Sequence, residues 1–465
     1  MRIVKVILVI ILILVCPILY GDDSYSGNNW VATSQGEAGK GNVVMDSARK
    51  AAVVADINQL LLEQYIFLDV AEKIKDHINA KLAHGDYDAI SDPAQFAATL
   101  RDDLREISKD LHFYLEYNPE RAKLVQARQS QSEEEIRRTE RILFEQDRLI
   151  NFGFDRLERF KGNVGYLDIG ILCNAEWAGE TAVAAMTFLA NTDAVIIDLR
   201  DTPGGYPNMV QLLCSYFIKG KKEGRTHLNT FERRFDNSIE QFWTLSYVPG
   251  KRMYDMDLYV LTSQFTASGA EELAYNMKCL KRAILVGGKT AGAANPEENK
   301  VIQGVFVMHL PTGRPVNPVS GTNWEQKGIV PDVAVPADQA LDTAYRMALD
   351  KLLNKAKDKD QKFQIEWALD GLKAKNAPWK IPSRILKKFA GDYGERKVWL
   401  KNGSLYYRRG EASPYKLIPL RENFFQVEGL DYFRVEFIMD EKSRVLELVR
   451  LYDDGTRIPS KRIYR

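Results

Sequence analysis

The chain has 465 residues, of which 45% are hydrophobic, so its apolar side chains can fill a buried core in each of several domains. Its 64 basic and 63 acidic residues leave a formal net charge of +1, which excludes a strong overall attraction to nucleic acid or to an anionic membrane. Four cysteines provide no disulfide framework and no pair with the CxxC spacing of a metal site. We therefore expect a globular, multidomain protein that does not bind nucleic acid.

Residues 1–21 have the pattern of a secretory signal peptide. Two basic residues precede an unbroken apolar run over residues 6–19, which is shorter than the ~20 residues of a transmembrane helix. We predict cleavage after Gly21, export across the inner membrane, and a periplasmic or extracellular mature chain with no transmembrane span. Two alternatives stay open: a lipoprotein signal that ends at Cys16, whose neighbours disfavour that processing, and an uncleaved anchor.

The mature chain keeps three of the four cysteines. Cys173, Cys214 and Cys279 each lie within an apolar stretch. Free cysteine is among the most buried residue types, so we interpret all three as small core side chains and not as redox or nucleophilic groups.

Residues 22–118 are expected to form an N-terminal helical bundle. Apolar residues recur there at spacings of three and four, which is the period of an amphipathic helix. A polar loop ends at Ser91 and Asp92, either of which could cap a third helix with Pro93 at its first turn. Residues 119–148 follow as a highly charged helix or linker, to which we assign no chemistry.

Residues 149–375 are expected to form the core. Short runs rich in β-branched residues, such as VGYLDIGIL and DAVIIDLR, alternate with helical segments such as GETAVAAMTFLAN. Strands this continuously apolar are buried on both faces, as in a sheet that helices cover. The pattern predicts a layered α/β domain.

Residues 381–465 change to a pure β pattern. At least six short strands fit this segment, with hairpin turns at Asn402-Gly403 and Asp454-Gly455. We expect a small antiparallel β domain, either a barrel or a sandwich.

Two turns in the core carry candidate chemistry. In IIDLRDTPGG, a buried strand leads to Gly204 and Gly205, whose unobstructed backbone N–H groups could form half of an oxyanion hole. In LTSQFTASGAEEL, a helix begins near Ser268, where backbone amides and the helix dipole would stabilise a developing negative charge. Each turn has a structural alternative: a tight strand-to-helix connection for the glycines, and a capping box of Ser268 with Glu271.

A serine nucleophile of the Ser/His type needs a histidine, and the chain has only five. His112 ends a helix next to the core, in KDLHFY, and we favour it as the general base over its reading as a surface histidine. Glu325, in NWEQKGIVPD, stands just before a turn as a candidate acidic partner.

Together these motifs resemble the tail-specific, or C-terminal processing, serine peptidase family over roughly residues 45–350. DLRDTPGG is similar to the family's glycine turn, TASGAEELAYNMKCLKRAILVGGKTAG to its nucleophile helix and following strand, and NWEQKGIVPD to its closing element. The helical segment that ends in DLHFY is most similar to the branch that includes interphotoreceptor retinoid-binding protein. The resemblance implies an α/β core of the crotonase-like ββα fold, which tricorn protease shares.

On this resemblance the nucleophile is Ser268, and the amides of Gly269 and Gly205 form the oxyanion hole. The classical members carry a general-base lysine 25 residues after the serine, where this chain has Ala293. Lys289 stands four residues too early to replace it. The Ser/Lys dyad is therefore absent.

Tricorn-like members instead use a histidine before the core and a glutamate after the nucleophile, and these positions match His112 and Glu325. The histidine of tricorn follows a serine, whereas this chain has Leu111, so we expect a link from Glu325 to His112 that is direct or passes through water. Asp110 is a second candidate for orienting His112, although residues two apart do not face each other on a helix.

Family members usually insert a PDZ domain between the helical part and the core. Only 52 residues separate His112 from Gly165 here, too few for a domain of roughly 90 residues. Specificity is therefore expected to come from the core groove or from the C-terminal β domain.

We expect a secreted or periplasmic serine peptidase that cleaves a polypeptide substrate through Ser268, His112 and Glu325, without a metal or an organic cofactor. It would be an endopeptidase or a carboxyl-terminal processing peptidase. The missing lysine favours an alternative, a noncatalytic protein that binds an apolar ligand on the same fold. The substrate and the oligomeric state stay open.

Overall fold

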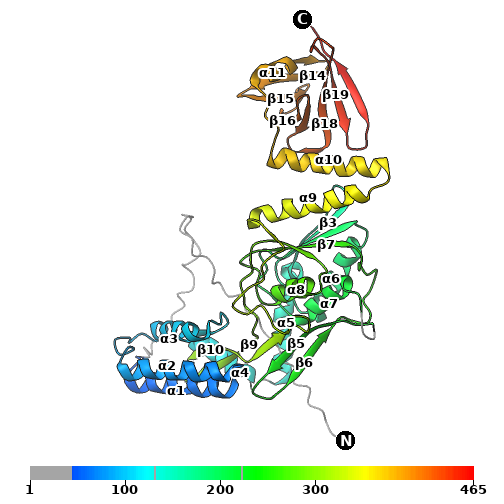
Figure 1. Ribbon diagram of the computed structural model, residues 1–465. Coiled ribbons are helices and arrows are strands. Elements are labelled where there is room, and N and C mark those ends of the chain that lie inside the picture. The colour runs from blue at the N-terminus through cyan, green and yellow to red at the C-terminus, as the bar shows by residue number, and fades with distance from the viewer. Residues whose placement is uncertain (1–43, 130–131, 221–223, 465) are drawn as a thin grey trace. The chain divides into compact units, whose positions relative to one another are not determined.

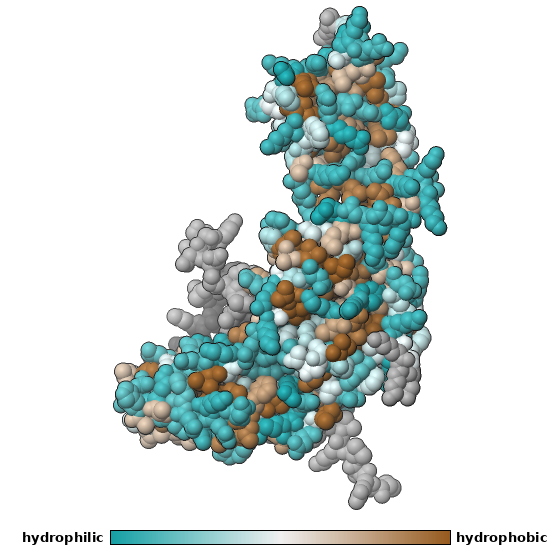
Figure 2. Space-filling model, in the orientation of Figure 1, coloured by the Kyte–Doolittle hydropathy of each residue, from teal (hydrophilic) through white to brown (hydrophobic). Residues whose placement is uncertain are grey.

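Figure 1 shows the protein as a computed structural model, which describes residues 44–129, 132–220 and 224–464. The predicted signal peptide therefore lies outside the described residues. Within these ranges, no helix is both long enough and apolar enough to cross a membrane. On the face drawn in Figure 2, hydrophilic side chains surround separate apolar patches, as is usual on the surface of folded proteins.

The chain divides into two compact units. The first contains the described residues up to Glu158, together with Tyr166–Asn191 and Val195–Ala340. The second contains Arg159–Gly165, Thr192–Ala194 and the chain from Leu341 onward. The domain limits set from the sequence stay predictions.

Three helices open the first unit: α1 (Ser47–Gln64), α2 (Leu68–His84) and α3 (Pro93–Ser108). Their apolar faces share one hydrophobic core, which confirms the helical region expected here. Asp92, and not Ser91, caps α3, because its carboxylate accepts a hydrogen bond from a first-turn amide at 2.7 Å.

A three-stranded antiparallel sheet completes this core, and the sequence pattern did not indicate it. β1 (Tyr114–Tyr117) pairs with β10 (Phe306–Pro311), which pairs with β9 (Glu297–Ile302). Tyr114 lies opposite His309, which is far along the chain. Because β1 is only four residues long and its partner strand is distant, the local sequence did not indicate this pairing. Four side chains of the β9–β10 hairpin are buried in the same core as the helices: Ile302, Phe306, Met308 and Leu310.

The charged stretch folds as two helices, α4 (Pro119–Gln129) and α5 (Glu133–Leu149). Ser132 and Glu135 form a complete capping box at the start of α5, and α5 has no buried residue. A helix with an exposed, charged surface is one of the two forms expected for this stretch. The short η1 (Asn151–Gly153) follows it.

The core contains a six-stranded sheet in the order β12-β8-β7-β4-β3-β2. β7 runs parallel to β8, and β8 runs parallel to β12. All five residues of β4 are buried, which is the continuous burial that the apolar runs predicted. The strands are β2 (Phe154–Phe160), β3 (Val164–Ile169), β4 (Ala194–Asp198), β7 (Asp257–Thr262), β8 (Ile284–Gly287) and β12 (Val333–Ala334).

Three helices supply buried apolar side chains to the core around this sheet. They are α6 (Ala175–Leu189), α7 (Pro207–Phe217) and α8 (Ser268–Cys279). A smaller antiparallel sheet has the order β11-β5-β6 and comprises β5 (His227–Arg233), β6 (Ile239–Trp243) and β11 (Gly313–Val316). The expected layered α/β core is confirmed.

The C-terminal strands form one antiparallel sheet of eight strands in chain order, from β13 to β20. A bridge between Asp392 and Ile463 joins its first strand to the chain beyond its last, so the sheet is a nearly closed barrel and not a sandwich. Figure 1 shows this barrel next to α10 (Lys359–Asn376). The remaining elements are α9 (Ala337–Lys355), α11 (Ser383–Phe389), β13 (Gly391–Tyr393), β14 (Arg396–Lys401), β15 (Ser404–Arg409), β16 (Tyr415–Arg421), β17 (Phe424–Val427), β18 (Leu430–Met439), β19 (Val445–Tyr452) and β20 (Arg457–Lys461).

A buried arginine of the barrel, Arg434, binds residues of α10. Arg434 of β18 is only 2% exposed, and its guanidinium lies 3.9 Å from the centre of the Trp367 ring. It donates to Gln426 at 3.0 Å and to the Trp367 carbonyl, and it lies 3.6 Å from Asp370. Burial lowers the pKa of Arg434 to about 10, because the charged form loses hydration.

Arg434→Ala is expected to lower the free energy of unfolding by about 3 kcal/mol, because it leaves Asp370 and Gln426 without their buried partner. Denaturant unfolding of the full chain, followed by tryptophan fluorescence, measures this loss. Arg421 is the matched control, since it pairs with the same Asp370 at 3.0 Å but is exposed. Arg421→Ala should cost less than about 1 kcal/mol, and equal losses would contradict the role given to Arg434.

Candidate active site

Ser268 stands at the start of α8 in a strained backbone conformation. Its φ is +49°, in the left-handed region that a residue with a side chain seldom adopts. The residue at the N-cap position is Ala267, and α8 has no side-chain cap. The capping-box alternative for the Ser268 hydroxyl is therefore wrong, and no hydrogen bond involves this hydroxyl within the described part of the chain.

The glycine turn lies directly against this serine. Gly204 and Gly205 have φ values of +134° and +142°. A Cβ atom on Gly204 would lie 2.7 Å from the Cβ of Ser268, and one on Gly269 would lie 2.6 Å from the Gly205 carbonyl oxygen. Only glycine permits this close approach of the two turns.

The two amides expected in the oxyanion hole are brought together by this packing. A Cβ on Gly269 would also lie 3.0 Å from the Gly205 nitrogen. Among the described residues, neither the Gly205 amide nor the Gly269 amide donates a hydrogen bond to another part of the chain. Two unpaired N–H groups beside a serine can bind the oxygen of a carbonyl under attack.

Glu271 makes contacts at the Ser268 turn that the sequence did not reveal. Its carboxylate is fully buried and accepts hydrogen bonds from the Ser268 amide at 3.1 Å, the Gly292 amide at 2.8 Å, the Ala293 amide at 2.9 Å and the Thr290 hydroxyl. Burial raises the pKa of Glu271 to about 7, against the opposing effect of these donors. The Ser-x-x-Glu spacing was visible, but it indicated only a helix cap.

Glu325 is bound by the same loop that binds Glu271. Its Oε2 accepts hydrogen bonds from the Ala294 amide at 2.6 Å and the Asn295 amide at 3.2 Å. Ala293, which stands where classical members carry lysine, accepts a hydrogen bond from Trp324 at 2.9 Å through its carbonyl. The loop thus connects the Ser268 turn to the predicted acidic residue.

His112 lies beside two carboxylates. Its Nδ1 is 3.5 Å from Asp110 Oδ1. One ring nitrogen of His112 and one carboxylate oxygen each from Asp110 and Glu325 all lie within 4.8 Å of one another. His112 Nδ1 and Glu325 Oε1 are both buried, and neither has a hydrogen-bond partner among the described residues. The structure therefore brings together His112 and Glu325, which are far apart in the sequence, and also places Asp110, the second candidate for orienting the ring, beside His112.

The charges in this cluster change one another's proton affinity. Burial lowers the pKa of His112, but the carboxylates of Asp110, Glu297 and Glu325 outweigh it and raise the value to about 9. Burial and the charge of Asp110 raise the pKa of Glu325, while His112 and two backbone donors oppose the rise. Buried titratable groups that shift one another's pKa are typical of catalytic sites.

A second histidine–carboxylate pair lies on β9 and β10. His309 Nδ1 is 2.6 Å from Glu297 Oε1, and its Nε2 is 3.0 Å from the Arg121 guanidinium. Both ring nitrogens of His309 are therefore engaged, so it is a weaker candidate for a general base than His112.

The three cysteines that the structure describes are poor candidates for a nucleophile. Cys173 and Cys214 are buried, Cys279 is half-buried, and all three are free. Burial raises the pKa of each thiol, which disfavours the reactive thiolate. This agrees with their interpretation as core side chains.

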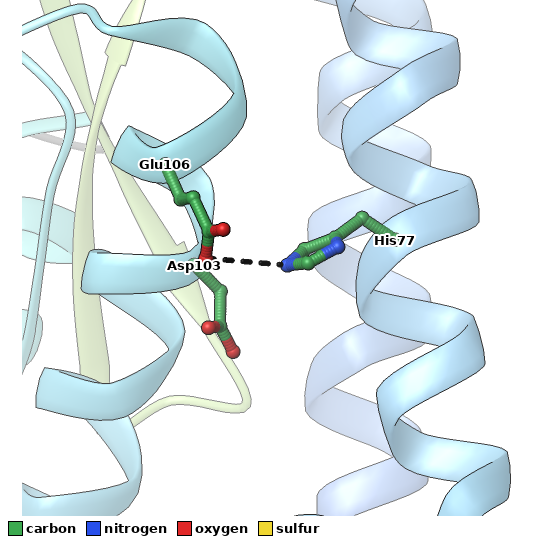
Figure 3. Close-up of side chains that lie close together, drawn as sticks. All are labelled: His77, Asp103 and Glu106. Atoms are coloured by element: carbon green, nitrogen blue, oxygen red, sulfur yellow. Dashed lines mark ion pairs between the residues drawn. The ribbon is translucent and has the colours of Figure 1, made fainter.

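Within the described residues, two groups of side chains carry oxygen and nitrogen atoms of the kind that bind divalent cations. One is the Asp110, His112 and Glu325 cluster, whose carboxylates already accept hydrogen bonds from backbone amides and from Asn295, so we interpret it as a hydrogen-bonded cluster. The other, in Figure 3, joins His77 of α2 to Glu106 of α3 at 3.8 Å, with Asp103 beside them. Asp103 already accepts a hydrogen bond from Tyr87 at 2.6 Å and pairs with Lys81 at 2.5 Å. We therefore interpret the second group as an ion-pair cluster between helices.

Comparisons with known proteins agree with the resemblance drawn from the sequence. A family model described as peptidase family S41 matches residues 163–335. A second model, the N-terminal domain of peptidase S41 in eukaryotic IRBP, matches residues 42–151.

Three solved structures illustrate what the chain is similar to. The photosystem II D1 C-terminal processing protease is 19% identical over 38% of this chain and 43% of its own, with a TM-score of 0.32. A putative peptidase from Parabacteroides merdae is 16% identical over 66% of this chain and 99% of its own, with a TM-score of 0.47. Tricorn protease is 13% identical over 70% of this chain and 37% of its own, with a TM-score of 0.40. The chain thus spans less than half of the D1 processing protease.

Gly205→Ala is expected to destabilise the protein by at least about 1–3 kcal/mol, because alanine disfavours φ of +142° and its Cβ would lie 2.1 Å from the Leu172 carbonyl oxygen. Thermal unfolding measures the loss. Gly179 is the control, since it lies within α6 and a Cβ there meets nothing within 4 Å. Gly179→Ala should leave stability unchanged or raise it by up to about 1 kcal/mol. A Gly205→Ala protein as stable as wild type would contradict the packing of the turn.

Proposed function

Since this chain belongs to peptidase family S41, through its matches at residues 42–151 and 163–335, we propose that it is a serine peptidase that uses Ser268, His112 and Glu325. The observation that carries the proposal is the strained Ser268, which lies against the glycine turn and beside two unpaired amides, those of Gly205 and Gly269. Neither the strain nor the unpaired amides stabilises the fold, whereas an oxyanion hole needs free amides and strained residues cluster at active sites.

The proposed reaction begins when Ser268 Oγ attacks a peptide carbonyl and His112 accepts the hydroxyl proton. The Gly205 and Gly269 amides stabilise the oxyanion that forms, and the negative charge of Glu325 stabilises the imidazolium. His112 then donates the proton to the leaving amine. Water hydrolyses the acyl group from Ser268 with His112 again as the base, which restores the enzyme.

The proposed substrate is a polypeptide, and the proposed cleavage is internal to it or near its carboxyl end. The segment between β1 and β2 folds as α4, α5 and η1, which supports an enzyme without a PDZ domain. We also propose export of the chain, on the signal-peptide pattern of residues 1–21.

The presence of Ala293 where classical members have lysine favours a second candidate, a noncatalytic protein that binds an apolar ligand on this fold. The two proposals differ in one measurable property, the nucleophilicity of Ser268. The base that His112 would supply is what distinguishes the peptidase.

A serine-directed phosphonate is expected to label the wild-type protein at Ser268, because the Gly205 and Gly269 amides stabilise the negative charge that develops on the phosphoryl oxygen as Ser268 attacks and the leaving group departs. Intact mass spectrometry detects the adduct. Ser268→Ala should lose it, whereas Ser246→Ala, which changes an exposed serine, should keep it. Absence of labelling at every pH near neutrality would support the binding protein instead.

The labelling rate is expected to rise from neutral pH to about pH 9. The pKa of His112 is raised to about 9, so the imidazole is mostly protonated at neutral pH, and only its neutral form can accept the serine proton. Below this pKa the rate should increase about tenfold for each pH unit. Glu325→Gln removes one charge that raises the His112 pKa, and it should move the profile to lower pH. A rate that falls from pH 7 to pH 9 would contradict His112 as the base.

A further inference from the structure

We propose that Asp110 is a positioning residue that holds the imidazole of His112 for catalysis, and that Asn295 holds Asp110 in place. This proposal deepens the proposed function and rests on it, because it takes His112 as the general base. It adds two residues that the family resemblance did not assign to a site.

The turn between α3 and β1 fixes Asp110 next to His112. Asp110 is only 1% exposed, and its own amide donates to the Ser108 hydroxyl at 3.1 Å. Its Oδ1 accepts a hydrogen bond from the backbone amide of His112 at 3.0 Å. Residues two apart do not face each other on a helix, but α3 ends at Ser108, so this restriction does not apply here.

Asn295 holds both carboxylates of the cluster from the opposite side. It is fully buried, and its side-chain amide donates to Asp110 Oδ2 at 2.9 Å. Its backbone amide donates to Glu325 Oε2 at 3.2 Å. One residue therefore sets the separation of two carboxylates that would otherwise repel each other.

The contacts of Asp110 suit it to orient the ring. Its Oδ2 is occupied by Asn295 and its Oδ1 faces His112 Nδ1 at 3.5 Å, a separation that catalytic pairs in empty sites often show before they tighten around a substrate. An Nδ1–H group directed at Asp110 leaves Nε2 free to accept the proton of Ser268. Glu325 then contributes the second negative charge.

The charge of Asp110 gives the role a measurable signature. Three carboxylates raise the pKa of the His112 ring: Asp110, Glu297 and Glu325. Loss of the Asp110 charge should lower the His112 pKa, whereas a merely structural loss would leave it unchanged.

The test uses Asp110→Asn and Asn295→Ala in the full chain, with phosphonate labelling and peptide hydrolysis measured against pH. Asp110→Asn is expected to reduce kcat by about 100- to 10,000-fold with little change in KM, because the ring loses its orientation. Its pH profile should move down by about 1–3 units. Asn295→Ala should reduce kcat in the same way with a smaller pH shift, because it removes no charge.

Asp103 provides the matched control. It is another buried carboxylate of the same helical region, 4% exposed, and it accepts a hydrogen bond from Tyr87 at 2.6 Å. Asp103→Asn should lower the unfolding temperature and leave the pH profile unchanged. A pH shift of equal size in Asp103→Asn would overturn the proposal.

Failure of the inference can be told from failure of the proposed function. If wild type reacts with no phosphonate at any pH, the proposed function fails. The His112 pKa, measured by NMR in Ser268→Ala, tests the pairing without catalysis and should fall when Asp110→Asn is added. A folded Asp110→Asn protein with unchanged His112 pKa and unchanged profile overturns the inference. If Asp110→Asn does not fold, wild-type rates in Asn295→Ala overturn it.

Discussion

Successive amides of the loop from Thr290 to Asn295 bind two buried carboxylates, and the candidate site depends on this interaction. The Gly292 and Ala293 amides bind Glu271, and the next two amides bind Glu325. A buried carboxylate without such donors would be costly to keep ionised. The loop amides therefore stabilise both buried carboxylates. Through these hydrogen bonds the loop also connects the Ser268 turn to Glu325, the proposed acidic partner of His112.

The same interaction accounts for how Ser268 keeps a strained backbone. A residue with a side chain at positive φ costs on the order of 1–3 kcal/mol, so surrounding contacts must hold it. Glu271 accepts the Ser268 amide, and the glycine turn packs against the Ser268 Cβ position. Strain, a fully buried carboxyl group and two unpaired amides do not stabilise a fold, and their coincidence around one hydroxyl is the reason for interpreting the site as catalytic.

The carboxylates around His112 have two opposing effects on the proposed proton transfer. Carboxylates close to an imidazole favour the protonated ring. They therefore stabilise the imidazolium that proton transfer would create, and they also raise the pH at which the neutral, basic ring forms. Backbone amides and the Asn295 side chain limit the repulsion between Asp110 and Glu325. The balance links the geometry of one loop to the pH range in which the enzyme would work.

The sequence by itself determined the class of each region and several local features. Periodicity gave the helices of the first unit, continuous apolar runs gave buried strands such as β4, and Asn-Gly and Asp-Gly turns gave the C-terminal β domain. Local motifs, together with the resemblance to the tail-specific peptidase family, singled out Ser268, Gly205, His112 and Glu325. These features depend on neighbouring residues, so a local pattern can carry them.

Only the tertiary structure decided which of these residues meet. The pairing of β1 with β10, the closure of the barrel through Asp392 and Ile463, and the contact of Asn295 with Asp110 all join segments that are distant in the chain. Glu271 shows the same limit, because its spacing from Ser268 suggested a cap, and only the distant Gly292 and Ala293 amides show that its carboxyl group is bound in the interior. Burial and charge neutralisation depend on the whole fold, and no local stretch of sequence encodes them alone.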